Sequence, residues 1–367
     1  MQHCDLRWAV AVALLTLVIT LAWLIPVLNK FEWDALTLAW IGTEFTEGKE
    51  PGDEGYSKGY DGQFAYAIAT RGFDATPVLD APTYRYQRIF YPALAAALAL
   101  GNDAAVPWTL LAINVAAHSI GAGLLAYLIA GAGGHPAFAL IYGLWIGGIV
   151  AVHLDLNESL AMALGLLGAL AYTRARVGWA ALCFALSALT KDFGLVFMAG
   201  FALHAWFSGR RRDALALGLG ATLPYAAWMV ALRLTVGRAV PDEQSPTSLP
   251  IIPFSGLAGA LNWVELGLML LWLVIPSVWL GALAVRTLRR NPKALYAWVM
   301  VCGALFIVFM PRETYADFAA TFRVALPTLV AMLLYTAYRY PRRLPLLAIF
   351  WAPTLIVAGY LPGFLPG

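Results

Sequence analysis

The chain has 367 residues, of which 61% are hydrophobic and only 12% are charged, and its mean hydropathy is +0.72. A soluble domain is roughly half apolar and about a quarter charged, so this composition excludes a soluble globular protein and predicts a multi-pass membrane protein. The net charge of +3 excludes little, because the placement of charges along a membrane protein matters more than their sum.

Hydrophobic runs predict an all-α polytopic membrane protein with about eleven transmembrane helices. A spanning helix needs about 20 apolar residues, and fewer suffice where a segment is re-entrant or buried within protein. The first run is too long for the core of a signal peptide, so we expect it to remain as the first helix. The expected spans are residues 8–28, 105–131, 137–153, 159–173, 178–190, 193–207, 214–234, 263–286, 294–310, 322–338 and 344–360.

The whole chain, residues 1–367, is expected to form a single integral membrane domain, because no separate soluble domain stands out. A long loop of residues 29–104, which carries interfacial helices, precedes a transmembrane bundle of residues 105–360. The three cysteines lie far apart and mostly in apolar runs, so they indicate neither a disulfide framework nor a metal site.

The distribution of lysine and arginine predicts the orientation in the membrane. With a cytoplasmic N-terminus, the cytoplasmic ends of the expected helices hold thirteen basic residues and only two acidic ones, Asp5 and Asp213. This excess of basic residues follows the positive-inside rule for a multi-pass protein of the plasma (inner) membrane. The thirteen are Arg7, Arg174, Arg176, Arg210, Arg211, Arg212, Arg286, Arg289, Arg290, Lys293, Arg339, Arg342 and Arg343.

With that orientation, the long first loop and the polar turns at residues 155–158, 191–192, 235–262 and 311–317 face the extracytoplasmic side. Nearly all potentially reactive groups then gather on one side of the membrane. Transporters tend to keep their polar groups near the middle of the membrane. A one-sided collection is more typical of an enzyme whose substrates meet at a membrane surface.

The stretch from Tyr60 to Phe73 places an acid, Asp61, at the head of a short segment with helical spacing of its apolar residues. The pattern predicts an amphipathic helix at the membrane interface. Gly62 follows the acid and permits close approach of backbone or ligand. From spacing alone, two interpretations stay open for Asp61: a helix N-cap and a catalytic carboxylate.

The cluster Tyr84-Arg85-Tyr86-Gln87-Arg88 comes just before the next apolar run. Arginine and tyrosine commonly anchor proteins at the membrane interface. Guanidinium groups also suit phosphate recognition, because they offer a fork of donors to phosphate oxygens. Both interpretations remain open, and the position beside the Asp61 helix favours the functional one.

Two turns between later spans carry polar groups. The segment from His153 to Glu158 is either an ordinary polar hairpin or a functional cluster, and its spacing does not fit known zinc motifs. Lys191 and Asp192 lie at the tip of a short hairpin, where charges are costly unless they pair or bind a ligand. Arg323 places a further charge near a later span.

Taken in order, these elements resemble the GT-C superfamily of membrane glycosyltransferases, in particular the branch of PIG-V-type mannosyltransferases and their bacterial relatives. The likeness covers most of residues 8–207 and extends thinly to the end. Tyr60 stands where the family usually has Trp. The matching stretches are Tyr60 to Phe64 with Ile68 to Phe73, Phe90-Tyr91-Pro92, Glu158-Ser159-Leu160, Ala188 to Gly194, and Arg323 with Pro327.

The resemblance implies a GT-C-like fold and an inverting transferase that uses a polyprenyl-phosphate-linked sugar as donor. Asp61 would act as general base, because a sugar hydroxyl is a poor nucleophile until a carboxylate takes its proton, and Asp34 is a rival base. Cationic groups would stabilise the phosphate leaving group, and the candidates are Arg85, Arg88, Lys191 and Arg323. Candidates for binding the acceptor or supporting these groups are Gln63, Tyr86, Gln87, His153, Glu158 and Asp192.

The implied partners are the lipid-linked donor, a glycan, lipid or protein acceptor, and membrane lipids, with no nucleic acid. No cofactor is required, although Asp34, Asp61 and Glu158 would offer a divalent metal site if the fold brings them together. Two rival functions stay open: a flippase or other transporter of lipid-linked sugars, and a non-catalytic subunit of a membrane assembly. A transporter should show charges at mid-span, and an assembly subunit should tolerate replacement of the loop acids.

Overall fold

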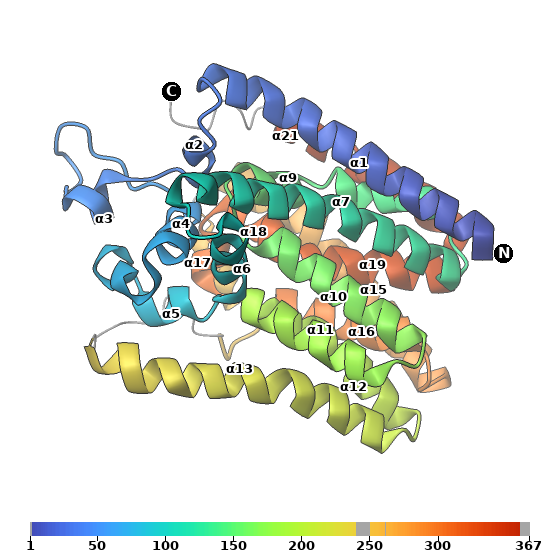
Figure 1. The fold of residues 1–367 in the computed structure, drawn as a ribbon. Helices are drawn as coiled ribbons and strands as arrows, with labels where there is room; N and C mark the ends of the chain where they lie inside the picture. The colour runs from blue at the N-terminus through green and yellow to red at the C-terminus, as the bar shows by residue number, and fades with distance from the viewer. Residues whose placement is uncertain (1, 240–249, 261, 360–367) are drawn as a thin grey trace.

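Every regular element in the described part of the chain is helical. The computed structural model describes residues 2–239, 250–260 and 262–359, and no β-strand occurs among them. Figure 1 shows long helices running side by side along the molecule, with short helices gathered at one end. The all-α prediction is therefore confirmed for these residues, and part of the expected loop 235–262 lies outside them.

Two long helices, α1 (Gln2–Lys30) and α7 (Val106–Ala132), pack against each other along the molecule. A Cβ atom added at Gly123 would lie 2.9 Å from the backbone oxygen of Ala9, so a small residue is needed where the two backbones approach. The other face of α1 exposes apolar side chains such as Leu14 and Val18, which is typical of a helix that contacts lipid.

The segment between α1 and α7 folds into short helices at one end of the molecule (Figure 1). The amphipathic helix expected after Asp61 is α4, and it buries Phe64 and Ile68 against its neighbours. A hydrogen bond of 2.9 Å from the indole Nε1 of Trp228 to the backbone oxygen of Tyr86 connects this end to α13. The elements are α2 (Leu36–Ala39), α3 (Thr43–Glu47), α4 (Gly62–Arg71), η1 (Gly72–Val78), α5 (Pro82–Tyr86), α6 (Phe90–Ala99) and η2 (Asp103–Ala105).

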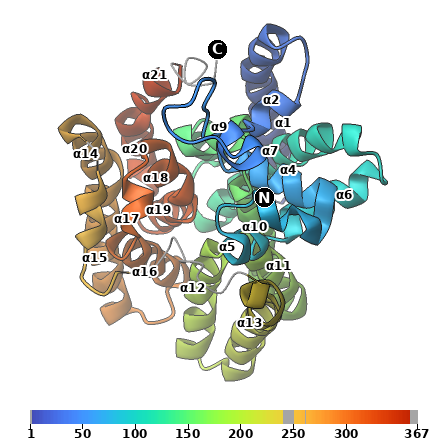
Figure 2. The same cartoon turned by 90° about the vertical axis from the view of Figure 1, so that its left-hand side faces the viewer.

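The remaining elements complete a bundle around α19, which packs against α7, α12 and α16. Seen along the helices in Figure 2, α14–α21 lie on one side, α1–α11 on the other, and α12 and α13 below them. The elements are η3 (Pro136–Ala139), α8 (Leu140–Gly143), α9 (Ile146–His153), α10 (Glu158–Thr173), α11 (Val177–Thr190), α12 (Phe193–Phe207), α13 (Arg211–Ala239), η4 (Ser255–Gly259), α14 (Trp263–Met269), the π-helical turn η5 (Leu270–Val274), α15 (Ile275–Arg290), α16 (Leu295–Val308), α17 (Arg312–Tyr315), α18 (Phe318–Val324), α19 (Leu326–Arg339), η6 (Pro341–Arg343), α20 (Leu344–Trp351) and α21 (Thr354–Gly359).

The prediction of eleven spans is not confirmed. Among the described residues, four continuous helices are long and apolar enough to cross a membrane, and six do so if two bent pairs each count as one span. The bends are 51° between Pro136–Gly143 and Ile146–His153, and 47° between Phe318–Val324 and Leu326–Arg339. Four other expected spans, 159–173, 178–190, 193–207 and 294–310, correspond to shorter apolar helices, which reach less far than the ~30 Å hydrocarbon layer. The expected span 344–360 is divided between α20 and α21, and residue 360 lies outside the described residues. A membrane-embedded protein with several spanning helices is the conclusion that the fold supports.

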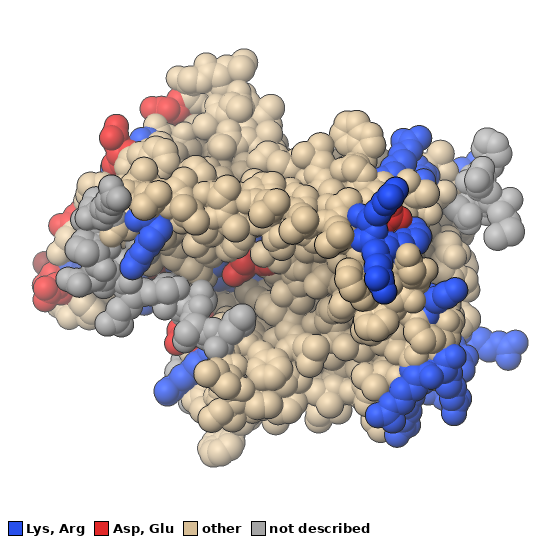
Figure 3. Space-filling view, turned by 90° about the horizontal axis from the view of Figure 1, so that it is seen from below, with Lys and Arg blue, Asp and Glu red and all other residues tan. Residues whose placement is uncertain are grey.

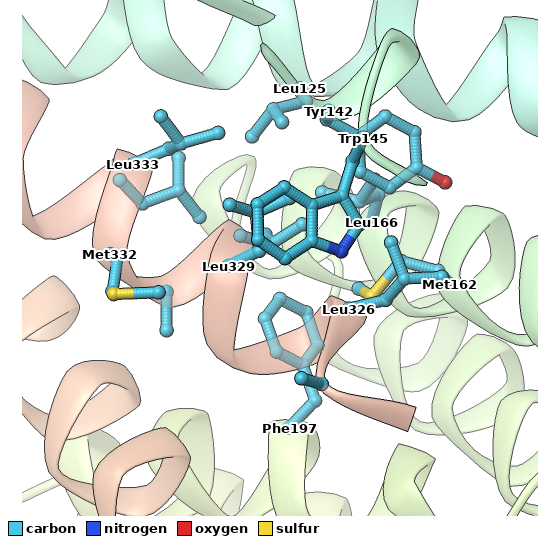
Figure 4. Packing of buried hydrophobic residues seen from close by; sticks show 14 of the residues in the cluster. Leu125, Tyr142, Trp145, Met162, Leu166, Phe197, Leu326, Leu329, Met332 and Leu333 are labelled. Carbon is cyan, nitrogen blue, oxygen red and sulfur yellow. The ribbon is translucent and has the colours of Figure 1, made fainter. Parts of the chain in front are cut away.

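The core of the bundle is a continuous apolar cluster in which α9, α10, α12 and α19 meet. Trp145 lies at its centre (Figure 4), and its indole Nε1 donates a 2.9 Å hydrogen bond to the backbone oxygen of Phe322. A Cβ atom added at Gly147 would lie 2.1 Å from that same oxygen. Gly147 and Trp145 therefore fix the position of α18 against α9, and α18 carries Arg323. Other residues of the cluster in Figure 4 are Leu125, Tyr142, Met162, Leu166, Phe197, Leu326, Leu329, Met332 and Leu333.

Charges divide between the two ends of the molecule. Figure 3 shows most basic side chains at the end that carries the N-terminus and most acidic side chains at the opposite end. The basic end includes Arg210, in the connection between α12 and α13, and Arg211 and Arg212 at the start of α13. The opposite end holds α4, α5, α18 and the turns that precede α10 and α12.

Candidate functional site

Asp61 lies directly before α4 but does not cap it. Its carboxylate accepts no hydrogen bond from the first backbone N–H groups of the helix. Instead, Oδ1 accepts from Nη1 of Arg85 at 2.9 Å and Oδ2 accepts from Nη2 of Arg323 at 2.6 Å. The helix-capping interpretation is therefore wrong for this conformation, and the carboxylate belongs to a polar cluster.

The two arginines extend this cluster in opposite directions. Arg85 also binds both carboxylate oxygens of Asp80, with two contacts of 2.6 Å. Arg323 also donates to Oε1 of Glu158 at 2.7 Å, and Nζ of Lys191 donates to the same oxygen at 2.9 Å. Ion pairs thus run without interruption from the first loop through α18 to the turn between α11 and α12.

The inner part of the cluster is buried. Glu158 is 0% exposed and Lys191 is 3% exposed, so each charge depends on its partners for compensation. The expected hairpin of α11 and α12 is confirmed, since Lys191 follows the last residue of α11 directly. This position explains why Lys191 occurs beside apolar helices, because its charge and that of Glu158 neutralise each other in the interior.

Close packing holds Asp61 against the turn between α9 and α10. A Cβ atom added at Gly62 would lie 2.2 Å from the backbone oxygen of Leu154 and 3.0 Å from that of Ala39. Only glycine permits this approach of the start of α4 to the two backbones. The expectation that Gly62 serves a close approach agrees with this contact.

Arg88 differs from the other cations of the site. Among the described residues it forms no ion pair, although it is only 7% exposed and its Nε has no hydrogen-bond partner. Its guanidinium lies 4.2 Å from the ring centroid of Tyr84 and donates to the hydroxyl of that residue. A buried guanidinium without a carboxylate partner is a ready binding group for an anion.

A cavity of about 1000 Å³ connects these charges to an apolar region. Its polar wall includes Asp61, Arg85, Arg88, Lys191 and Arg323. Figure 3 shows charged atoms inside a hollow on one long face of the molecule. The apolar wall comes mainly from α12 and α16, through Leu195, Val196, Ala199, Cys302, Leu305, Phe306 and Phe309.

The environment of Asp61 keeps it ionised. Burial alone would raise the pKa of this carboxyl, but the neighbouring charges of Arg85 and Arg323 outweigh burial and hold the pKa well below its ordinary value. A carboxylate with so low a pKa binds cations and dipoles well, but it is a weak proton acceptor. Any role as a base therefore requires that its arginine pairs weaken when substrate binds.

No family model, no curated protein and no solved structure matches this chain. The GT-C resemblance thus remains a hypothesis that rests on the sequence motifs, and functional inference depends on the geometry of the site.

Several residues expected in the site lie elsewhere or have structural partners. Asp34 is exposed, and its Oδ1 accepts a hydrogen bond from the backbone N–H of Leu36 at 3.0 Å. The hydroxyl of Tyr86 donates to the backbone oxygen of Gly72 at 2.9 Å inside an apolar cluster. His153 is buried and lines neither described cavity of the site.

Gln63, Gln87 and Asp192 do line the large cavity. Gln63 also supports the loop, because its Oε1 accepts from the backbone N–H of Gly42 and its Nε2 donates to the backbone oxygen of Lys58, both at 3.0 Å. The carboxylate of Asp192 caps α12 through the backbone N–H of Phe193.

The described residues contain no group of three or more His, Cys, Asp or Glu side chains that could hold a metal ion. Asp61 and Glu158 both contact Arg323, which separates the two carboxylates. Asp34 belongs to the turn before α2. The three carboxylates considered for a divalent metal are therefore not brought together.

The site also includes residues that sequence reasoning missed. The hydroxyl of Tyr60 donates to the carboxylate of Asp317 at 2.6 Å, and the guanidinium of Arg323 lies 5.3 Å from the Tyr60 ring centroid. Tyr60 directly precedes Asp61, and Asp317 directly precedes α18. The signal available in the sequence was that Tyr60 is next to Asp61 and that Asp317 lies shortly before Arg323.

Proposed function

We propose that the chain is an inverting membrane glycosyltransferase of the GT-C type, which moves a sugar from a polyprenyl-phosphate donor to an acceptor hydroxyl. The observation that carries this proposal is the large cavity, which joins buried cations to an apolar space between α12 and α16. A polyprenyl phosphate has the same two parts, an anionic head and a long apolar chain.

The large cavity has a polar wall that suits the phosphate of the donor and an apolar wall that suits its isoprenoid chain. Arg88 and Lys191 offer cationic donors to the phosphate, and charge-assisted hydrogen bonds of this kind are strong where water is excluded. Leu305 and Phe306 of α16 face the isoprenoid chain from one side, and Leu195 of α12 faces it from the other. The sugar then lies near the rim of the cavity, beside Asp61.

The reaction needs a proton acceptor and a stabilised leaving group. The bond between the anomeric carbon and the phosphate oxygen breaks as the acceptor oxygen attacks, and the hydroxyl proton passes to Asp61. The phosphate leaves with its charge stabilised by the arginines and Lys191. A bound phosphate competes with Asp61 for Arg85 and Arg323, which weakens the pairs that lower the carboxyl pKa and makes Asp61 a better base.

The orientation is part of the same proposal. We place the N-terminus in the cytoplasm and the site on the extracytoplasmic side of the plasma (inner) membrane. Basic residues lie mainly at the end of the molecule opposite the site (Figure 3), as the positive-inside rule requires for this orientation. Lipid-linked sugars and their acceptors would then meet at the outer surface.

Binding of polyprenyl phosphate to the purified protein in lipid nanodiscs tests the proposal. We expect Arg88→Gln to weaken this binding about tenfold or more, because hydrogen bonds to charged groups contribute about 1.5–3 kcal/mol each. Arg71→Gln is the matched control, since Arg71 is exposed at the end of α4 and lines neither cavity. Equal affinities of wild type and Arg88→Gln would remove Arg88 from the donor site, and no binding by the wild type would contradict the proposed substrate class.

A further inference from the structure

Asp155 is a buried carboxyl group that neither the motifs nor the ion-pair cluster explain. It is 0% exposed, neither of its carboxyl oxygens has a hydrogen-bond partner of ordinary geometry, and the side chain of Asn114 interacts with it only weakly. Its backbone φ of 48° is in the left-handed region, which non-glycine residues seldom adopt. A buried carboxyl group without a well-formed hydrogen bond and a strained backbone both cost free energy, and together they point to a functional position.

The turn that carries Asp155 lies close to Asp61, which also lines the large cavity. A second, small cavity of about 30 Å³ lies between this turn and α4, and Asp61, Arg85, Arg88, Asp155 and Asn157 line it together with apolar residues. Asp61 borders both cavities. Gly62 lies close to the backbone of Leu154, so the residues next to them in the chain, Asp61 and Asp155, belong to segments in direct contact.

The size and the charges of the small cavity restrict what it can bind. Its volume suits a single hydroxyl group or water molecule. The two arginines in its wall disfavour a cation, and the Asp61 carboxylate disfavours an anion. A neutral hydroxyl group both donates and accepts hydrogen bonds, so it can accept from the arginines and donate to the acids that line the cavity.

We propose that this small cavity binds a hydroxyl group of the acceptor and that Asp155 is its hydrogen-bond partner, on the far side of Asp61 from the donor. The inference rests on the proposed function and names the acceptor class as a polyhydroxylated compound, such as a sugar. A sugar carries hydroxyl groups on adjacent carbons, so one can bind Asp155 while the reacting one faces Asp61.

The surroundings of Asp155 suit contact with a neutral ligand. Burial raises the pKa of Asp155 well above its ordinary value, and the Asn114 side chain offsets this only in part. A raised pKa favours the protonated form of the carboxyl group, and in that form it both donates and accepts hydrogen bonds, as a sugar hydroxyl does. Among the described residues Asp155 forms no ion pair, which separates its role from that of Asp61.

Binding of octyl α-mannoside to the protein in lipid nanodiscs tests this inference without requiring turnover. We expect saturable binding by the wild type, weakened about tenfold or more in Asp155→Ala and less in Asp155→Asn, which keeps hydrogen-bonding capacity. Octanol, which has the chain but only one hydroxyl, should not compete. Asp103→Asn is the matched control, because Asp103 is exposed and lines neither cavity.

Polyprenyl phosphate binding is measured on the same samples and should change less than twofold in both Asp155 variants. Glycoside affinity that is absent in the wild type or unchanged in Asp155→Ala overturns the inference. Parallel loss of both ligands in Asp155→Ala and Asp155→Asn marks a structural residue and also overturns it. Failure of the wild type to bind polyprenyl phosphate while it binds the glycoside contradicts the donor proposal alone, so the two failures are distinguishable.

Discussion

At the scale of single residues, the site is a chain of shared charges in which most members have two partners. Arg85 binds Asp61 and Asp80, and Arg323 binds Asp61 and Glu158. Removing the charge of Asp61 therefore leaves each arginine with one carboxylate. Removing the charge of Glu158 takes from Lys191 its only described ion pair.

This difference predicts unequal effects on stability. We expect Glu158→Gln to lower the free energy of unfolding by about 3–5 kcal/mol, because a buried cation loses its partner. Asp61→Asn should cost about 1 kcal/mol or less, because its side chain is 25% exposed and both arginines stay paired. Thermal unfolding in detergent, followed by tryptophan fluorescence, ranks the variants. Equal losses for the two variants would show that the ion pairs are not shared in this way.

The sequence predicted some of the residues that form the site, but not how they pair. Arg85, Lys191 and Arg323 stand beside polar turns or helix ends, so charge placement indicated them. Their partners were not predictable, because Asp61 and Arg323 are far apart in the chain and meet only through packing of α18 on α9. Asp155 was not singled out within the segment from His153 to Glu158, because that segment also suits an ordinary polar hairpin, and the burial of Asp155 follows from tertiary structure alone.

At the scale of elements, the position of Asp61 depends on the contact between α4 and the turn before α10. Gly62→Ala places a Cβ atom 2.2 Å from the Leu154 oxygen, and backbone cannot move aside as easily as a side chain. We expect a loss of about 1–3 kcal/mol in stability and loss of binding in both cavities. Gly131→Ala in α7 is the control, since nothing lies within 4 Å of its added Cβ, and a helical Ala is favourable.

Thermal unfolding and polyprenyl phosphate binding of these two variants provide the measurement. Wild-type behaviour of Gly62→Ala in both assays would contradict the coupling between α4 and the turn. A loss in Gly131→Ala equal to that in Gly62→Ala would mean that the effect is general to glycine replacement in these helices.

Helix prediction succeeded where an apolar run is continuous and failed where tertiary packing bends the chain. The run at residues 8–28 became α1, and the run at 105–131 became α7. The expected span 322–338 is bent by 47° between α18 and α19. Pro327 near the start of α19 is the local signal for this break, but its angle follows from the packing of α18 against α9.

At the scale of the whole molecule, the separation of charges and the placement of the two cavities belong to one arrangement. The site lies at the acidic end and the basic residues lie mainly at the other (Figures 1 and 3). A membrane protein with this asymmetry has a defined orientation. The large cavity extends from the polar end along α12 and α16, as a lipid-linked donor in the membrane would require.

We propose that Asp61 assists sugar transfer from a polyprenyl phosphate. The most direct test of this proposal is incubation of the purified protein in nanodiscs with polyprenyl-phosphate sugars labelled in the sugar, with octyl glycosides as acceptors. We expect the wild type to form labelled disaccharide product with inverted anomeric configuration. Asp61→Asn should bind polyprenyl phosphate but transfer sugar about 100- to 10,000-fold more slowly, while Asp103→Asn should match the wild type. Transfer at the wild-type rate by Asp61→Asn, or none by the wild type with any sugar, would contradict the claim.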